Sequence, residues 1–332
     1  MIIHLKKEIG NSKANEIAAK IDAFVIDSKS HYVLVTSSSV KELPSGLGDN
    51  VLEHFIFPDD MQLSAKQYMN STREIQFGNV RIGGNTNNTI MIAGPCSVES
   101  ETQIQESSAL LKANNLTMLR GGCYKPRTSP YSFQGLGFAG LQLLAKMREQ
   151  HGLAVITEVR DATHVHEVIE HSDIIQIGAK AMYDQGILRA CAKTTKPVMI
   201  KRGFGSTLQE TVQCAEFVLS GGNNNVAICE RGIRTFETKT RFTLDLCGVA
   251  YLKEYTNLPV ILDPSHAMGH AYGVPDLTRA CMAMGVDGLI IEVHPNPKVA
   301  KSDASQQLNH DEFQELMRTL PPIGKAIGRN LV

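Results

Sequence analysis

Residues 153–178 read LAVITEVRDATHVHEVIEHSDIIQIG, in which two short apolar runs, 153–159 and 172–178, flank a polar segment of helical character. The two runs are too continuously apolar to alternate between a buried and an exposed face, which is typical of strands covered on both sides. Parallel strands of this kind are connected by crossover helices. The stretch therefore predicts a strand–helix–strand unit of a parallel sheet.

The same pattern recurs along the chain from about residue 88. Apolar runs occupy 89–94, 117–122, 153–159, 172–178, 197–201, 225–230, 258–263 and 286–293. Helical segments follow them, for example at 100–115, 138–152, 206–222 and 274–285, and several begin and end with residues typical of helix caps. Eight such units in about 245 residues predict an α/β fold of the (β/α)₈ TIM-barrel type. An open dinucleotide-binding sheet would carry G-x-G-x-x-G after its first strand, and the sequence has none there.

The first 65 residues do not follow this strand–helix pattern. Short strands are expected at 1–7, 23–28, 31–38 and 51–57, and one helix at 12–23. This order predicts a small α+β domain over 1–65, ferredoxin-like with a poorly formed second helix. Residues 66–84 are assigned to a linker and a barrel-capping hairpin, with the linker character beginning at 62 and the hairpin spanning 74–84. The barrel is assigned to 85–332.

The composition indicates an ordinary soluble protein. The chain has 332 residues, of which 42% are hydrophobic and 20% charged, with a formal net charge of −1. This balance argues against a nucleic-acid partner or a membrane surface, and no apolar run approaches the roughly 20 residues of a membrane span. The N-terminal apolar stretch is too short for a signal peptide. Seven scattered cysteines, an odd number, indicate a reducing compartment, and we expect a cytoplasmic protein.

Cationic side chains gather where the predicted strands end. The active site of such a barrel forms at the C-terminal ends of its strands. The cations found there are Arg120, Lys125, Arg127, Lys180, Lys201, Arg202, Arg231 and Arg234. The acidic residues that balance them lie mostly in the helical segments. Any one of these cations could be a solvated loop residue, but the group predicts a site for multiply anionic ligands, because guanidinium and ammonium groups suit phosphate and carboxylate oxygens.

Four potential metal ligands also follow strand ends. Cys96 follows the first strand, His266 the seventh and Glu292 the eighth, and Asp303 lies in the loop beyond. Each alone could be a packing residue or an ion-pair partner, but together they predict a divalent-metal site with mixed hard and soft ligands that does not select one metal. Cys123 is a rival thiol. The remaining cysteines are expected to serve packing: Cys191, Cys214, Cys229, Cys247 and Cys281.

Seven motifs carry a family resemblance. They are AGPCSVES (93–100), RGGCYKPRTSPYSFQGLG (120–137), DIIQIGAK (173–180), KPVMIKRG (196–203), CERGIRTFE (229–237), LPVILDPSH (258–266) and GLIIEVHPNPKVAKSDASQQL (288–308). In this order they resemble 3-deoxy-D-arabino-heptulosonate-7-phosphate (DAHP) synthase, type I-beta, the branch with a small N-terminal regulatory domain. The resemblance covers nearly all of 74–332. It implies condensation of phosphoenolpyruvate with D-erythrose 4-phosphate and water, releasing phosphate, which is the first step of the shikimate pathway to aromatic amino acids.

The resemblance also implies roles for individual residues. One divalent ion, such as Mn, Fe, Co or Zn, would be bound by Cys96, His266, Glu292 and Asp303. Phosphoenolpyruvate would be bound by Arg120, Lys125, Lys180, Lys201 and Arg231, and erythrose 4-phosphate by Pro126, Arg127, Thr128 and Asp263. Catalytic roles fall to Lys125, His266 and Asp303, with Lys125 the candidate proton carrier. Two positions depart from the family pattern: Lys180 and His270 both stand where arginine is common, so the phosphate contacts of Lys180 should differ.

Two alternative functions remain open. One is 3-deoxy-D-manno-octulosonate-8-phosphate synthase, whose aldose loop usually reads K-A-N-R-S-S, whereas a Pro-Arg-Thr loop suits the shorter aldose. The other is a non-catalytic sensor of phosphoenolpyruvate, which would not need four metal ligands.

For residues 1–65 the resemblance implies feedback inhibition by tyrosine or phenylalanine, bound where two copies meet, in a homo-tetramer. A packing or assembly role is the alternative for this domain.

Overall fold

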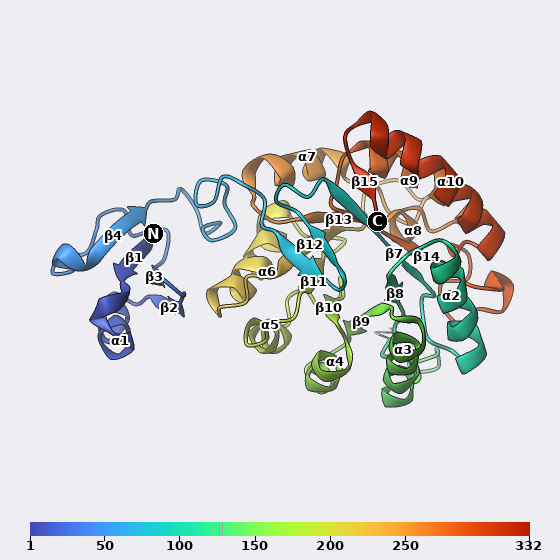
Figure 1. Ribbon diagram of the computed structural model, residues 1–332, viewed down its shortest axis with the longest axis horizontal. Coiled ribbons are helices and arrows are strands. Elements are labelled where there is room, and N and C mark those ends of the chain that lie inside the picture. Colours follow the sequence, from blue (N-terminus) through green and yellow to red (C-terminus); the bar gives the residue numbers. More distant parts are fainter. Residues whose placement is uncertain (126, 128) are drawn as a thin grey trace.

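The computed structural model describes residues 1–125, 127 and 129–332 (Figure 1). Its main sheet consists of parallel strands β7 (Asn88–Gly94), β8 (Met118–Arg120), β9 (Ala154–Val159), β10 (Ile174–Ile177), β11 (Val198–Lys201), β12 (Val226–Glu230), β13 (Val260–Leu262) and β14 (Gly288–Glu292). β14 pairs with both β13 and β7, where Glu292 lies opposite Gly94, so the sheet closes on itself. A short strand β15 (Asn330–Leu331) pairs with the start of β7. The prediction of a (β/α)₈ barrel is confirmed.

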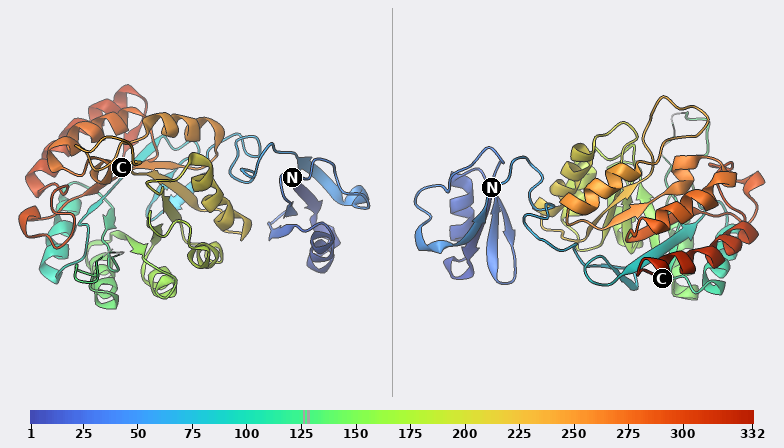
Figure 2. Two further views of the ribbon diagram at one scale, coloured as in Figure 1. Left: turned by 180° about the vertical axis from the view of Figure 1, so that it is seen from behind. Right: turned by 90° about the horizontal axis from the view of Figure 1, so that it is seen from above.

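Helices form a ring around the barrel (Figures 1 and 2). They are α2 (Glu101–Ala113), α3 (Phe138–His151), α4 (Val165–His171), α5 (Gln185–Ala192), α6 (Leu208–Ser220), α7 (Leu246–Tyr255), α8 (Pro264–Met268), α9 (Val274–Ala283) and α10 (His310–Ala326). Local sequence fixes their starts: α6 opens with a capping box of Thr207 and Glu210, and α10 with one of Asn309 and Glu312. Among the described residues, none of these helices combines the length and apolarity needed to cross a bilayer.

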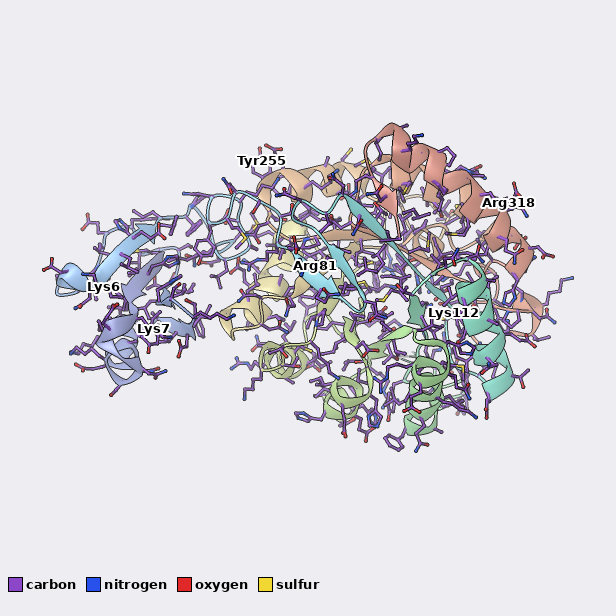
Figure 3. The ribbon with its side chains drawn as sticks, in the orientation of Figure 1. Lys6, Lys7, Arg81, Lys112, Tyr255 and Arg318 are labelled. Atoms are coloured by element: carbon purple, nitrogen blue, oxygen red, sulfur yellow. The ribbon has the colours of Figure 1, made fainter. Side chains whose placement is uncertain are left out.

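A hairpin fills the N-terminal end of the barrel. Its strands β5 (Ile75–Phe77) and β6 (Val80–Ile82) pair antiparallel, and Phe77 packs with Ile92, Met118 and Ile290 of the barrel interior. Arg81, on the outer side of the hairpin, stays in solvent and pairs with Glu74 at 2.9 Å (Figure 3). Because this end is plugged by apolar side chains, ligands can reach the strands only from the opposite, C-terminal end.

The N-terminal residues form a separate sheet beside the barrel (Figures 1 and 2). Strands β1 (Ile2–Lys6), β2 (Phe24–Asp27), β3 (His31–Val35) and β4 (Val51–Phe55) pair antiparallel in the order β2-β3-β1-β4. Helix α1 (Asn11–Lys20) packs on one face through Ile17 and Ala18. The place of a second helix is taken by a single 3₁₀ turn, Gly48–Asn50, because residues 36–50 are rich in Ser, Gly and Pro.

The linker predicted to begin at residue 62 is anchored to the barrel at its start. Gln62, Leu63 and Ser64 are buried, and their backbone N–H groups all donate to the carboxylate of Glu216 in α6, at 2.8, 3.1 and 2.8 Å. The Gln62 side chain reaches the other way and donates to the carbonyl of Thr36 at 2.8 Å. A half-buried carboxylate that receives several N–H donors is a strong local anchor, so this segment is fastened to both parts.

Candidate active site

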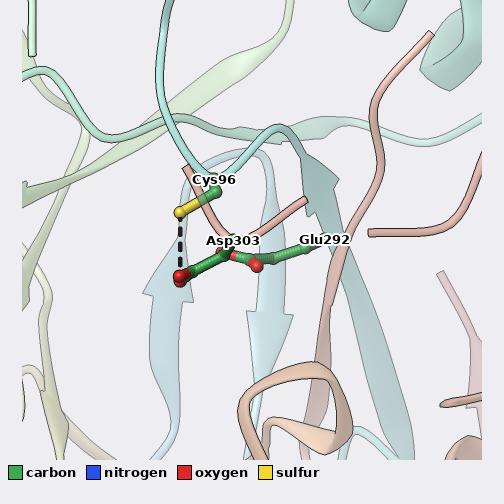
Figure 4. Close-up of side chains that lie close together, drawn as sticks. All are labelled: Cys96, Glu292 and Asp303. Atoms are coloured by element: carbon green, nitrogen blue, oxygen red, sulfur yellow. Dashed lines mark hydrogen bonds between the residues drawn. The ribbon is translucent and has the colours of Figure 1, made fainter. Parts of the chain in front are cut away.

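The predicted metal ligands converge at the C-terminal end of the barrel. Cys96 follows β7, Glu292 ends β14 and Asp303 lies in the following loop, and their ligand atoms all lie within 4.8 Å of one another. The Cys96 thiol donates to Asp303 Oδ2 at 3.4 Å (Figure 4). Closure of the barrel thus brings Cys96 next to Glu292 and Asp303, which lie some 200 residues later in the sequence, because β7 and β14 are neighbours.

His266 completes this group from helix α8. Its Nε2 lies 3.5 Å from Glu292 Oε1 and 3.7 Å from Asp303 Oδ2, and its Nδ1 lies 2.8 Å from Asp263 Oδ2. Burial lowers the pKa of His266 against the opposing effect of Asp263 and Glu292, so the imidazole is neutral at pH 7 and Nε2 can offer its lone pair. The carboxylate behind a ligating histidine fixes the orientation of the ring.

The chemistry of this group fits a divalent metal ion. It offers one imidazole, one thiol and two carboxylates, a donor set found for divalent transition metals. Burial, together with the Glu292 charge, raises the pKa of the Cys96 thiol to about 12, so coordination would have to displace a proton. Lys125 Nζ lies 3.2 Å from Cys96 Sγ and donates to the Cys96 carbonyl at 3.1 Å, where its charge would stabilise a thiolate.

A cavity of about 320 Å³ opens beside these ligands. The cations in its wall are Lys125, Arg127, Lys180, Lys201, Arg231, Arg234 and Arg241, and they outnumber the carboxylates Glu158 and Asp303. Phe204 and Phe242 form one side, with the Arg231 guanidinium 4.3 Å from the Phe242 ring and the Arg234 guanidinium 4.8 Å from the Phe204 ring. Arg231 Nη1 is buried without a hydrogen-bond partner among the described residues, so it is available to an anion.

Two residues assigned to the substrates, Arg120 and Asp263, and the strand-end cation Arg202 do not line the cavity. Arg120 is buried behind the cavity and donates to Glu292, and Arg202 forms a buried ion pair with Glu230 at 2.9 Å, so neither belongs to the cavity wall. Asp263 is also outside the wall. Its carboxylate contacts His266 and Lys201. These two residues lower the pKa of Asp263 more than burial raises it, so the carboxylate is ionised. Pro126 and Thr128 lie outside the described residues.

The second candidate thiol, Cys123, does not face the metal-ligand group. Cys123 is fully buried, and its sulfur faces Gly140 of α3, where an added Cβ would lie 3.1 Å from it. Burial raises its pKa to about 12. Within the described part of the chain, the one group with metal-binding geometry is that of Cys96, Glu292 and Asp303.

The sequence analysis did not include Arg241 among the cations of the site. Arg241 lies in the same strand-end loop as Arg231 and Arg234, and that shared loop could have indicated it.

The fold and this site define a barrel enzyme in which a candidate metal-binding group adjoins a cationic cavity. A model of the DAHP synthetase I family matches residues 60–327, and the chain belongs to that family. The phospho-2-dehydro-3-deoxyheptonate aldolase of Thermotoga maritima is 42% identical over 267 residues, covering 80% of this chain and 78% of that protein.

Solved structures and a second group of relatives extend the comparison. The crystal structure of the T. maritima DAHP synthase superposes with a TM-score of 0.80 at 35% identity, covering 100% of this chain and 99% of that one. A truncated form of that synthase covers 81% of this chain with a TM-score of 0.76 at 37% identity. The 2-dehydro-3-deoxyphosphooctonate aldolase of Bordetella petrii is 32% identical over 264 residues, covering 72% of this chain and 92% of that protein.

Proposed function

We propose that this protein condenses phosphoenolpyruvate with D-erythrose 4-phosphate and water to give 3-deoxy-D-arabino-heptulosonate 7-phosphate and phosphate. The observation that carries the proposal is the cavity in which His266 and Asp303 adjoin seven lysines and arginines, with the Cys96 thiol directly behind Asp303. The two substrates together bring roughly five negative charges, which need such compensation before they can approach one another. Family membership and the 42% identical T. maritima protein support the same reaction.

The wall of the cavity suggests where each substrate binds. We assign phosphoenolpyruvate to Lys125, Lys180, Lys201 and Arg231, the cations grouped on the β8, β10, β11 and β12 side. Arg127, whose Nη1 lies 4.0 Å from Asp303 Oδ1, is assigned to the sugar phosphate. Arg120 and Asp263 act from behind: Arg120 holds Glu292, and Asp263 holds Lys201 and orients His266.

The reaction then follows from this arrangement. C3 of phosphoenolpyruvate attacks the aldehyde carbon of the sugar, water adds at C2, and cleavage of the C2–O bond of the resulting tetrahedral intermediate releases phosphate. A divalent ion held by Cys96, His266, Glu292 and Asp303 supplies Lewis-acid polarisation of the aldehyde. The added water loses two protons as its oxygen becomes the C2 carbonyl: one balances the proton gained by the aldehyde oxygen, and the other leaves on the released phosphate. Lys125 lies between the ligand group and the cavity, and we assign it the proton delivered to that oxygen.

The competing assignment is the octulosonate reaction, because B. petrii and other relatives with that name also match. Phosphate release should be measured with erythrose 4-phosphate and with a five-carbon aldose phosphate such as arabinose 5-phosphate, each with and without a chelator. We expect turnover with the four-carbon aldose, lost on chelation and restored by added Mn²⁺ or Co²⁺. Preference for the five-carbon aldose would favour the octulosonate reaction, and no release with either would indicate a sensor.

The same assay tests the sugar-phosphate assignment. Arg127→Ala removes a charge-assisted contact worth about 1.5–3 kcal/mol, and should raise KM for erythrose 4-phosphate about 10- to 150-fold. KM for phosphoenolpyruvate should change little, because its assigned cations remain. If only the phosphoenolpyruvate KM rises, Arg127 serves the other substrate.

We further propose that the N-terminal domain mediates feedback inhibition by tyrosine or phenylalanine within a homo-tetramer. The domain contributes no residue to the cavity wall. Such a ligand inhibits only if it binds an arrangement that closes the cavity better than one that leaves it open. Because Glu216 fastens residues 62–64 to the barrel while the Gln62 side chain holds Thr36 and the Met1 amine, movement of the domain requires those Gln62 contacts to break.

Deletion of residues 1–61 tests this regulatory role. Retaining residues 62–65 keeps the half-buried Glu216 carboxylate paired. The structure of a truncated form of the T. maritima synthase, which covers 81% of this chain, has been solved, so we expect an active barrel. Activity should persist while inhibition by either aromatic amino acid is lost. A full-length enzyme that no aromatic amino acid inhibits would leave the domain with an assembly role only.

A further inference from the structure

Two adjacent glutamines, Gln306 and Gln307, lie in the loop between β14 and α10, and each is only 1% exposed. Buried amides outside regular structure need specific hydrogen-bond partners. Here those partners include two of the four candidate metal ligands. The same loop carries a third ligand, Asp303, whose backbone has the left-handed φ of 46° that non-glycine residues seldom adopt.

Gln306 bridges the carboxylate ligands. Its Nε2 donates to Glu292 Oε2 at 2.5 Å, and its Oε1 accepts from Arg241 Nη1 at 2.6 Å. The same Arg241 nitrogen lies 3.3 Å from Asp303 Oδ2. Arg120 donates to the other oxygen of Glu292, so both oxygens of that carboxylate are fixed. An amide side chain can donate to a carboxylate through its nitrogen and accept from a guanidinium through its oxygen.

Gln307 holds the thiol ligand through its backbone. Its Oε1 accepts from the Cys96 N–H at 3.0 Å, and its Nε2 donates to the Ser302 carbonyl at 2.8 Å. The hydroxyls of Ser302 and Ser97 lie 2.6 Å apart. The residue before Asp303 is therefore tied to the residues around Cys96, which fixes the distance between the thiol and the Asp303 carboxylate.

We propose that Gln306 and Gln307 are positioning residues that set the affinity of this site for a divalent cation. One loop supplies a ligand, Asp303, and orients two others, Glu292 through Gln306 and Cys96 through Gln307. The fourth ligand is held independently by Asp263. This proposal rests on the metal site of the proposed function. Outer hydrogen bonds to metal ligands typically change affinity about 10- to 100-fold, and each glutamine should contribute within that range.

The test uses the metal-stripped full-length protein and its variants Gln306→Leu and Gln307→Leu. Affinity for Mn²⁺ and Co²⁺ is measured by competition with a fluorescent chelator. Gln103→Leu is the matched control, because Gln103 is also buried and bridges the Ser97 carbonyl (2.9 Å) and the Glu99 N–H (3.1 Å) but contacts no ligand. We expect Kd to rise about 10- to 100-fold in the first two variants and to stay unchanged in the control.

The visible and near-ultraviolet absorption of bound Co²⁺ distinguishes the role of Gln307, which holds Cys96, from that of Gln306, which holds Glu292. Gln307→Leu should weaken the thiolate-to-cobalt charge-transfer band, because the displaced ligand is Cys96, whereas Gln306→Leu should preserve it. Should the leucine variants fail to fold, Gln306→Asn and Gln307→Asn decide instead, since the shorter amide stays polar but cannot span both partners. Unchanged Kd values, or an equal loss in Gln103→Leu, would overturn the proposal. A wild-type chain that binds neither ion would overturn the metal site itself, and the roles of both glutamines with it.

Discussion

Replacing Cys96 with alanine should lower turnover more than about 100-fold, because outer hydrogen bonds alone change metal-site affinity or activity by about 10- to 100-fold and this change removes a ligand outright. Only His266, Glu292 and Asp303 would remain, with two carboxylates and no thiolate. The measurement is phosphate release by the purified variant across a Mn²⁺ or Co²⁺ titration. Very high metal concentration should restore part of the activity, because the remaining three ligands still lie close together.

Cys123→Ala is the matched control for this change. Both thiols are fully buried, and burial raises the pKa of each to about 12, so accessibility and acidity do not distinguish them. Only their positions differ, since Cys96 faces Asp303 and Cys123 faces Gly140. The control should retain most of its activity. Full activity of a metal-free Cys96→Ala protein would contradict the assigned role of Cys96.

Strand positions were predictable because buried parallel strands leave continuous apolar runs in the sequence. All eight predicted runs overlap a strand of the barrel, and Cys96 and Glu292 at their ends, with Asp303 in the loop after the last, form one group. Barrel closure places the first and last strands side by side. The direction in which each strand-end side chain points was harder to predict, because successive residues of a strand face opposite sides.

Two pairs of consecutive residues, Lys201–Arg202 and Glu230–Arg231, show how neighbours at a strand end point in different directions. Lys201 and Arg231 face the cavity, whereas Arg202 and Glu230, each adjacent to one of them, face away and pair with each other. The prediction that Arg202 belongs to the anion site is therefore wrong. Arg241 could not be placed from the sequence because it lies in an irregular loop, which returns to the barrel through the pairing of Ile233 with Thr243.

Arg202 consequently leads to a stability prediction rather than a catalytic one. Its Nη1 lies 2.9 Å from Glu230 Oε2 and 2.8 Å from Asp245 Oδ2, and its Nη2 donates to the Ser206 carbonyl at 3.1 Å. Arg202→Met leaves the Glu230 carboxylate buried without its cation. Breaking a buried ion pair in this way costs about 3–5 kcal/mol. Urea denaturation of the variant should show a loss of that size in the free energy of unfolding.

The loss should depend on pH. Burial raises the pKa of Glu230, and Arg202 opposes that rise, so its removal raises this pKa further. A carboxylic acid whose pKa is higher in the folded than in the unfolded state lowers the free energy of unfolding when pH exceeds its unfolded pKa. This loss of stability grows with pH until pH passes the folded pKa. The deficit of Arg202→Met should therefore be largest at neutral pH and shrink under acidic conditions, where Glu230 is protonated.

Two further variants separate the buried charge from other causes. Adding Glu230→Gln to Arg202→Met removes the stranded charge but keeps an acceptor for the Gly232 N–H, which donates to Glu230 at 2.7 Å, so part of the lost stability should return. Arg148→Met is the partly exposed control, because Arg148 and Asp173 are 35% and 31% exposed and pair at 3.4 Å, and it should cost less than about 1 kcal/mol. Equal losses in Arg202→Met and Arg148→Met, or no recovery in the double variant, would mean that the buried pair does not stabilise the β11–β12 side of the barrel as the contacts predict.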